Sequence, residues 1–169
     1  MTVIPGDPMD DLPPELSPNL EFVFETRVEF TPDRCIFGPL PGGHKQGYTP
    51  CSGGTIYGPR LQGRIVPNSG ADFAVVRPDG VIEINSHYML EADDGTKIYL
   101  NNWGYLVMSK PGEGLISHGT PQPQYFRFTP RFKVAEGPHD WLMRTVIIGC
   151  GSRRSDPVDH SIFRYYAVR

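Results

Sequence analysis

The chain has 169 residues, a formal net charge of −3, and 19 glycines and 18 prolines, so about a fifth of its positions are Gly or Pro. Hydrophobic residues make up 38% and aromatic residues 11% of the chain, which is too much apolar material for a disordered protein. These totals exclude disorder and argue against a helical bundle, and they favour many short strands joined by tight turns.

The length fits a single domain, and the slightly acidic balance gives no electrostatic reason to expect a nucleic-acid partner. No run of 18 apolar residues is present, so we expect no membrane span. The acidic, Pro-rich start differs from a signal peptide, which predicts a cytoplasmic protein. Cys35, Cys51 and Cys150 are widely spaced and odd in number, which predicts free thiols in a reducing compartment.

Residues 1–18 contain five prolines and four carboxylates, and we expect them to form an extended arm on the surface or on a second copy. Residues 19–169 then form the domain proper. From Leu20 to Phe30 apolar and polar residues alternate, which predicts a long, half-buried strand. Its inward face would carry Leu20, Phe22, Phe24, Thr26, Val28 and Phe30.

Two segments, 31–54 and 109–123, are rich in Gly and Pro and have no period. We predict that both are long loops at one mouth of the fold, where they could form a lid. A second strand is expected over residues 55–66, closed by the sequence PNSG.

A meander of three strands follows, over residues 72–77, 81–92 and 96–108, joined by PDG and DDG turns. Three further strands are predicted over residues 125–134, 141–150 and 161–168, and no segment has the period and caps of a helix. About eight strands are enough to close one antiparallel β-barrel with a filled or ligand-sized interior.

The two Asp-Gly turns, at 78–80 and 93–95, predict how the meander strands pair. In each, a three-residue loop with Gly in the left-handed region fixes the register. The second turn places Ser86 opposite Asn102, and the first places Asp72 opposite Ser86. An acid, a hydroxyl and an amide would therefore form one polar row across the apolar inner face.

Polar groups on a core-facing surface need partners, because burying one unpaired costs about 1–3 kcal/mol. The three side chains either hydrogen-bond to one another and to a buried water, or form the polar patch of a small-molecule site. In such a site Asp72 would have a raised pKa and act as the general acid or base. Ser86 and Asn102 would orient the substrate.

Further candidates follow from parity. Tyr88 shares the inner face with Ser86 and could donate its phenol hydrogen to a substrate oxygen. Tyr57 alternates in step with Leu61 and Ile65, so it should also face the interior and could be a second donor. Phe126 and Trp141 are expected to line the cavity, if only as wall. His87 points outward by parity, and would turn inward as a base only if its strand is bulged.

No metal site and no cofactor site are predicted. The remaining histidines fall in predicted loops without the spacing of metal ligands. The segment GCGSRR lacks the glycine spacing and helix of a dinucleotide fingerprint, and no phosphate-binding loop or nucleophile elbow is present.

The blocks GGTIYGPRLQGRIVPNSGADF, HYMLEADDGTKIYLNNWG, YFRFTPRF and HDWL resemble the small-barrel family called domain of unknown function 3237. The resemblance covers residues 19–168 and is most specific over 53–72. It implies an all-β barrel of calycin or allene-oxide-cyclase type but no general activity. Two positions depart from the family pattern: His87 stands where Arg is common, and Met143 where Asn usually follows the Trp-Leu pair.

We therefore predict a cofactor-independent enzyme acting on a small, mostly apolar metabolite by isomerase, cyclase or lyase/hydratase chemistry. A non-catalytic carrier or sensor barrel for the same ligand class is the alternative, and a structural oligomer with a filled interior is a third. In each case we expect a homo-oligomer, with a dimer favoured, because the aromatic outer positions Tyr99, Trp103 and Tyr105 would otherwise face water.

Overall fold

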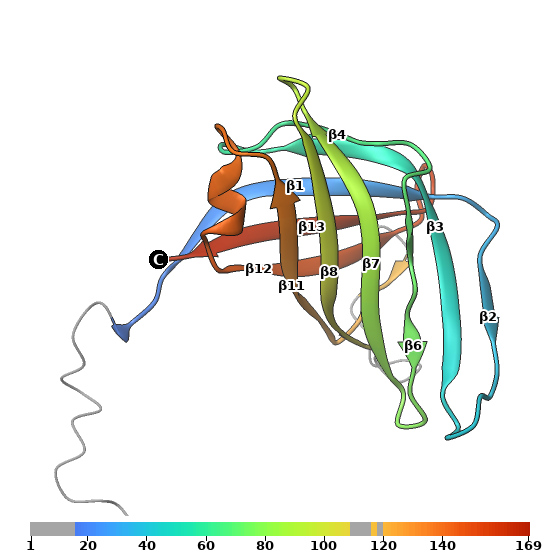
Figure 1. The fold of residues 1–169 in the computed structure, drawn as a ribbon. Coiled ribbons are helices and arrows are strands. Elements are labelled where there is room, and N and C mark those ends of the chain that lie inside the picture. The colour runs from blue at the N-terminus through green and yellow to red at the C-terminus, as the bar shows by residue number, and fades with distance from the viewer. Residues whose placement is uncertain (1–15, 109–115, 118–119) are drawn as a thin grey trace, which may run out of the picture.

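In the computed structural model, which describes residues 16–108, 116–117 and 120–169, antiparallel strands form a sheet that curves round and closes on itself (Figure 1). The closed barrel has eight strands, with short extra strands beside them. Along the chain these elements are β1 (Leu20–Phe30), β2 (Cys35–Phe37), β3 (Lys45–Tyr57), β4 (Gly63–Ile65), β5 (Ala71–Asp72), β6 (Val75–Val76), β7 (Val81–Ala92), β8 (Lys97–Val107), β9 (Ile116–Ser117), β10 (Thr120–Pro121), β11 (Tyr125–Val134), the 3₁₀ helix η2 (Asp140–Met143), β12 (Ile147–Arg154) and β13 (His160–Val168).

Around the barrel the order is β1-β13-β12-β11-β8-β7-β4-β3, and β3 returns to β1 to close the ring. The short β5 and β6 continue the line of β4 between β3 and β7. Closure depends on Gly54, whose φ is +145° and where an added Cβ would lie 1.9 Å from the carbonyl oxygen of Arg27. Only glycine lets β3 approach β1 this closely.

Aromatic rings fill the part of the barrel where β1, β11 and β13 meet. Phe24 stacks on Tyr165 with ring centroids 4.3 Å apart, and Phe128 meets Tyr165 edge-on at 5.4 Å. Leu90, Ile98 and Leu100 complete this core and are completely buried. Burial of these side chains stabilises the barrel.

The register predicted from the two Asp-Gly turns is confirmed. Ser86 pairs with Asn102 across β7 and β8, and Asp72 pairs with Ser86 across β5 and β7. The inner face of β7 alternates as expected, with Ile84, Ser86, Tyr88, Leu90 and Ala92 buried.

The prediction of a loop over 31–54 and a strand over 55–66 is wrong. Most of the first segment forms a hairpin of β2 and β3, in which β2 lies at the outer edge beyond β3 (Figure 1). β3 ends at Tyr57, and the chain turns before pairing resumes at β4. The Gly and Pro residues hide this strand in the sequence, because β3 is held by pairing with β1 on one side and with β4 to β6 on the other.

In β1 the predicted inner face is interrupted by a bulge between Phe22 and Phe24. Val23 and Phe24 are both buried there, and Phe22 turns to the outside, where its ring lies 5.8 Å from that of Tyr166. Leu20 is also exposed. One extra residue in a strand reverses the facing of every residue before it.

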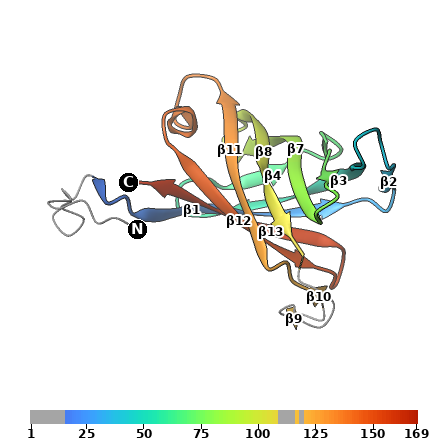
Figure 2. The same cartoon turned by 90° about the horizontal axis from the view of Figure 1, so that it is seen from below.

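The strand predicted over 141–150 begins later, at Ile147, and η2 occupies its first residues. β13 begins one residue earlier than expected, which places His160 in a strand rather than a loop. The segment 109–123 contains the β9–β10 pair, and β10 contacts β12 (Figure 2). Most of the predicted arm, residues 1–15, lies outside the described residues.

Among the described residues, no helix has both the length and the apolar character needed to cross a bilayer.

Candidate functional site

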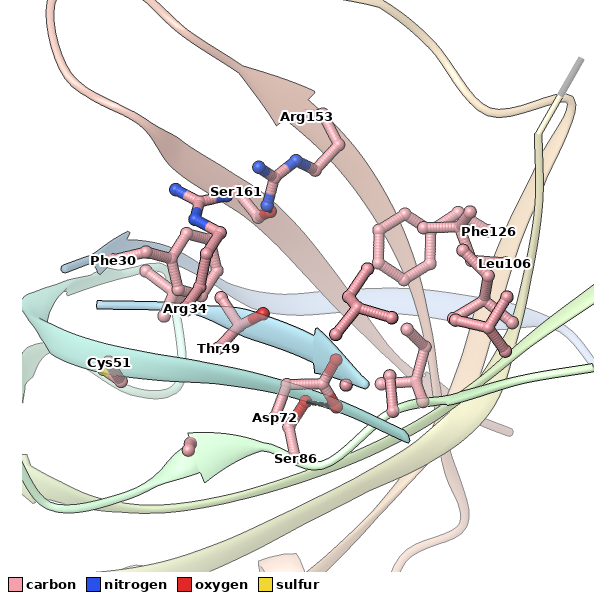
Figure 3. Close-up of a pocket in the computed structure, with 18 of the residues that line it drawn as sticks. Phe30, Arg34, Thr49, Cys51, Asp72, Ser86, Leu106, Phe126, Arg153 and Ser161 are labelled. Carbon is pink, nitrogen blue, oxygen red and sulfur yellow. Dashed lines mark hydrogen bonds between the residues drawn. The ribbon is translucent and has the colours of Figure 1, made fainter. Parts of the chain in front are cut away.

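One end of the barrel interior is an open cavity of about 400 Å³, walled by β3, β5 and β7 on one side and by β12 and β13 on the other (Figure 3). Pockets of this size hold small organic molecules. Most of its surface is apolar, from side chains that include Val28, Phe30, Ile82, Ile84, Leu106, Phe126 and Phe163. Its polar side chains are Arg34, Thr49, Cys51, Asp72, Ser86, Tyr88, Thr120, Arg153 and Ser161.

Asp72 presents its carboxyl group to this cavity from the end of β5. The Ser86 hydroxyl donates to its Oδ1 at 2.9 Å, and the backbone N–H of Asn85 donates to the same oxygen at 3.0 Å. β5 can lie this close to β7 because residue 70 is glycine: a Cβ there would lie 1.7 Å from the carbonyl oxygen of His87. The predicted pairing of Asp72 with Ser86 is thus a direct hydrogen bond.

Burial raises the pKa of Asp72 above its ordinary value of 3.8, and this effect outweighs the two hydrogen bonds to Oδ1, which oppose it. The charges of Arg153 and His87 also oppose the rise. Because both hydrogen bonds end on Oδ1, the acidic proton belongs on Oδ2. Asp72 therefore has one oxygen that is held in place and a second that can exchange a proton with a ligand.

Asn102, the third member of the predicted row, is bound elsewhere. Its Nδ2 donates to the hydroxyl oxygens of Tyr165 at 3.0 Å and Tyr88 at 3.2 Å, and it is 2% exposed. It is not part of the cavity wall, so its predicted contact with substrate is replaced by a structural role below the floor.

Tyr88 forms part of that floor. Its hydroxyl accepts the hydrogen bond from Asn102 and is also hydrogen-bonded to the Tyr165 hydroxyl, so both of its polar partners lie in the buried core. Burial raises the pKa of Tyr88 well above its ordinary value, which keeps the phenol protonated at neutral pH. The parity prediction for Tyr88 is confirmed, since the residue faces inward and lines the cavity.

Tyr57 and Trp141 lie away from the cavity, which corrects their predicted positions. Tyr57 is 70% exposed at the end of β3, where Ile56 takes the inward position instead. Trp141 belongs to η2 and packs against the core with the Arg60 guanidinium 3.9 Å from its ring centroid. Phe126 does line the cavity, as predicted.

His87 faces outward, as its parity predicts, because β7 carries no bulge at that position. Its Nδ1 is hydrogen-bonded to the Tyr99 hydroxyl, and its Nε2 lies 2.8 Å from Asn85 Oδ1 and 3.1 Å from Asn101 Nδ2. This outer network lies on the opposite face of β7 from Ser86. His87 can therefore affect Asp72 through charge but does not line the cavity.

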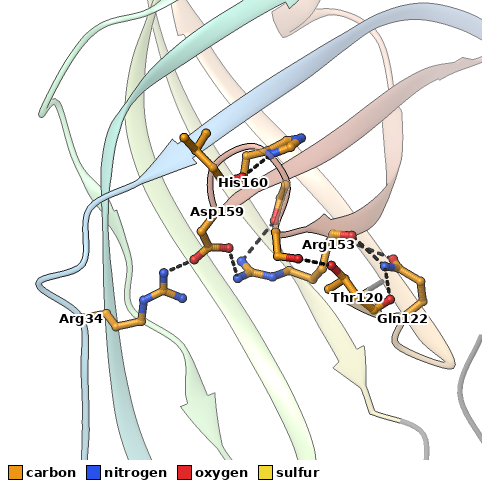
Figure 4. Close-up of polar contacts among 9 residues, drawn as sticks. Arg34, Thr120, Gln122, Arg153, Asp159 and His160 are labelled. Atoms are coloured by element: carbon orange, nitrogen blue, oxygen red, sulfur yellow. Dashed lines mark hydrogen bonds and ion pairs between the residues drawn. The ribbon is translucent and has the colours of Figure 1, made fainter. Parts of the chain in front are cut away.

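Two arginines of the cavity were not foreseen from the sequence. Arg153 donates from Nη2 to Asp159 Oδ1 at 2.7 Å and from Nη1 to Ser161 Oγ at 3.3 Å (Figure 4). Arg34 pairs through its Nη2 with the other oxygen of Asp159. Gln122 holds the Arg153 backbone, accepting from its N–H at 3.0 Å and donating to its carbonyl at 2.7 Å.

The sequence feature that could reveal Arg153 is the alternation of inward and outward residues along β12. Ile147, Gly149, Gly151 and Arg153 share the inward face, but a strand that stops at 150 does not reveal it. The glycines leave room for aromatic rings, since a Cβ at position 149 would lie 2.1 Å from the Phe128 ring.

Within the part of the chain that the structure describes, no group of three His, Cys, Asp or Glu side chains is placed to hold a metal ion.

Comparison with known proteins identifies relatives of the whole barrel. The family model described as protein of unknown function (DUF3237) matches residues 18–168. A UPF0311 protein of Rhodopseudomonas palustris is 35% identical over 116 residues, which cover 64% of this chain and 72% of that protein. A UPF0311 protein of Clostridium acetobutylicum is 30% identical over 126 residues, covering 70% and 75%.

Solved structures share the architecture. A β-barrel-like protein from Acinetobacter baumannii has a TM-score of 0.78 at 28% identity, covering 94% of this chain and 99% of that one. An enzyme from Penicillium herquei has a TM-score of 0.66 at 18% identity, covering 90% and 95%, and at this identity the likeness shows the fold alone. Because the family model spans the barrel from before β1 to the last residue of β13, the chain belongs to the DUF3237 family.

Proposed function

We propose that the protein is a cofactor-independent enzyme that moves a proton on a small, mostly apolar metabolite held in the barrel cavity. The observation that carries this proposal is the Asp72 carboxyl group, which is fixed through one oxygen, has a raised pKa and faces an apolar cavity. A carboxyl group whose pKa is shifted toward neutrality exchanges protons efficiently near physiological pH.

In this proposal Asp72 gives its Oδ2 proton to one atom of the substrate and takes a proton back from another. The net change is an isomerisation or cyclisation, and with water as a second reactant it is a hydration or its reverse. No electrons are gained or lost in these steps. Ser86 fixes the carboxyl orientation, and Tyr88 forms part of the cavity floor.

The protein of similar fold from Penicillium herquei is described as an enzyme, so this barrel architecture supports catalysis in at least one other protein. That likeness is an analogy of fold and names no reaction for this chain. The proposal therefore depends on the Asp72 site and is tested there.

Solvent deuterium provides a test that does not require the substrate to be known. A library of apolar metabolites with an acidic C–H or an activated double bond is incubated with the protein in D₂O and analysed by mass spectrometry. We expect the wild-type protein to incorporate deuterium into a subset of compounds, and Asp72→Asn to reduce that rate about 10²- to 10⁴-fold. Equal rates in the two proteins would refute the role of Asp72.

Asp79→Asn is the matched control, because Asp79 lies in an exposed turn and the substitution makes the same chemical change. A ¹³C titration of the Asp72 carboxyl group separates the enzyme from the alternative, a carrier or sensor barrel. A raised pKa is required for proton transfer, whereas an ordinary pKa near 3.8 would favour binding alone.

A further inference from the structure

The polar end of the cavity carries unbalanced charge. Arg34 and Arg153 both pair with Asp159, so one carboxylate lies between two guanidinium groups. Both arginines line the cavity, and Figure 3 shows them on the side away from Phe126 and Leu106. This end therefore has a net positive charge whenever Asp72 is protonated.

We propose that Arg153 and Arg34 bind the carboxylate of a ligand whose remaining, apolar part fills the cavity. This inference rests on the proposed function, because it names the substrate class of the same site.

Donors are available for such a group. Each terminal nitrogen of a guanidinium carries two N–H groups, and Arg153 uses one of each for Asp159 and Ser161. The Ser161 hydroxyl accepts from Arg153, which leaves its own hydrogen to donate, and Ser161 is 1% exposed. Two planar guanidinium groups beside a hydroxyl match the acceptor geometry of a carboxylate.

The position of Arg153 is fixed before any ligand arrives. Gln122 holds its backbone on both sides, Asp159 holds its side chain, and the Phe30 ring centroid lies 5.2 Å from its guanidinium carbon. A positioned donor loses little entropy on binding, which makes Arg153 an effective anchor.

The electrostatics agree with this placement. Burial lowers the pKa of Arg153 from its ordinary value, and the charge of Arg34 acts in the same direction. The negative charge of an anion in the cavity would favour the charged guanidinium and so oppose both effects. The same anion would be repelled by an ionised Asp72, so the site suits a ligand with a single negative charge at the arginine end.

The test compares 2-naphthoate with 2-naphthamide, which have nearly the same shape and differ in charge, by calorimetric titration of the full chain. We expect the carboxylate to bind about 10- to 100-fold more tightly than the amide, the range for a hydrogen bond to a charged group. Arg153→Gln should remove this preference while leaving amide affinity unchanged. Arg153→Lys should keep part of it.

Arg164→Gln is the matched control, because it removes the same charge from an exposed residue that pairs with Glu25 on the outside of the barrel. If Arg153→Gln does not fold, Arg34→Gln supplies the same comparison from a more exposed position. Equal affinity for acid and amide, or no binding of either at millimolar concentration, would overturn the inference.

Asp72→Asn separates this inference from the proposed function. It should retain the preference for the carboxylate, since the arginines are untouched, while losing deuterium incorporation. If the wild-type protein shows no preference for the carboxylate while Asp72→Asn still loses deuterium incorporation, only the anion site is overturned. If the preference is present and Asp72→Asn incorporates deuterium at the wild-type rate, only the role of Asp72 is overturned.

Discussion

The two carboxyl groups beside the cavity behave differently because their partners differ. Asp159 lies between two arginines at the rim, whereas Asp72 receives a hydroxyl and an amide hydrogen bond within an apolar wall. The first pairs with both guanidinium groups and positions them. Burial raises the pKa of the second, which is why we assign the proposed proton transfer to Asp72.

Asp72→Asn should raise the free energy of unfolding relative to wild type at neutral pH. A raised pKa in the folded state means that Asp72 contributes most stability below its ordinary value of 3.8 and loses that contribution as pH rises through the folded value. Asparagine keeps an oxygen for both hydrogen bonds and does not titrate. Urea denaturation from pH 3 to pH 8 measures the difference, which should grow with pH. A difference that shrinks with pH would contradict the raised pKa.

Asn102→Ala should lower the free energy of unfolding by about 2–4 kcal/mol, because two buried hydrogen bonds are lost and a small void remains. Asn102 joins Tyr88 to Tyr165 beneath the cavity floor. Asn101→Ala, on the outer face of the same strand, is the comparison; it removes part-buried hydrogen bonds to Asn85 and Ser86 and should cost less than Asn102→Ala. Urea denaturation compares the two, and similar losses would show that the tyrosine bridge has no special weight.

At the scale of elements, β7 and β8 could be predicted and β3 could not. The turns PDG and DDG are local, and their loop geometry alone fixes the pairing of Asp72, Ser86 and Asn102. β3 contains KQGYTPCSGGTIY, whose composition is that of a loop, and it becomes a strand only through distant partners. Local signals therefore placed Asp72 correctly and failed for Tyr57.

Dependence on distant partners also explains why the contacts of Arg153 and Asn102 could not be predicted from the sequence. Arg153 enters the site because β12 extends to residue 154, an extent set by pairing with β13. Asn102 was placed on the correct face, but its contacts depend on Tyr165, which is 63 residues away in sequence. The strand register predicts which residues share a face. Hydrogen-bond partners across the barrel can be identified only once the closed structure is known.

Gly70→Ala should destabilise the protein by more than Gly80→Ala and should also disturb Asp72. A Cβ at position 70 would meet the backbone of β7, which cannot give way without moving β5. Gly80 has open space around it, so alanine there costs only the strain of its φ of +86°, about 1 kcal/mol. Denaturation measures stability, and the ¹³C shift of the Asp72 carboxyl group reports the site. Equal losses with an unchanged shift would refute the close-approach argument.

For the whole molecule, the barrel interior consists of a packed core and an open cavity. The rings of Phe24, Phe128 and Tyr165 pack together in the core, while a cavity with a polar end stays open. A structural oligomer with a filled interior does not match this arrangement.

On the outer surface, we predict that the protein self-associates through the aromatic face of β8. Trp103 and Tyr105 lie there 44% and 36% exposed, with ring centroids 5.0 Å apart, and contiguous exposed aromatic surface marks interaction sites. We expect light scattering to give a dimer for the wild-type chain and a monomer for the double variant Trp103→Ser, Tyr105→Ser. Tyr57→Ser is the control, because it removes an even more exposed aromatic ring from β3 and should leave the dimer intact. A wild-type monomer, or loss of the dimer in the control as well, would show that β8 is not the contact.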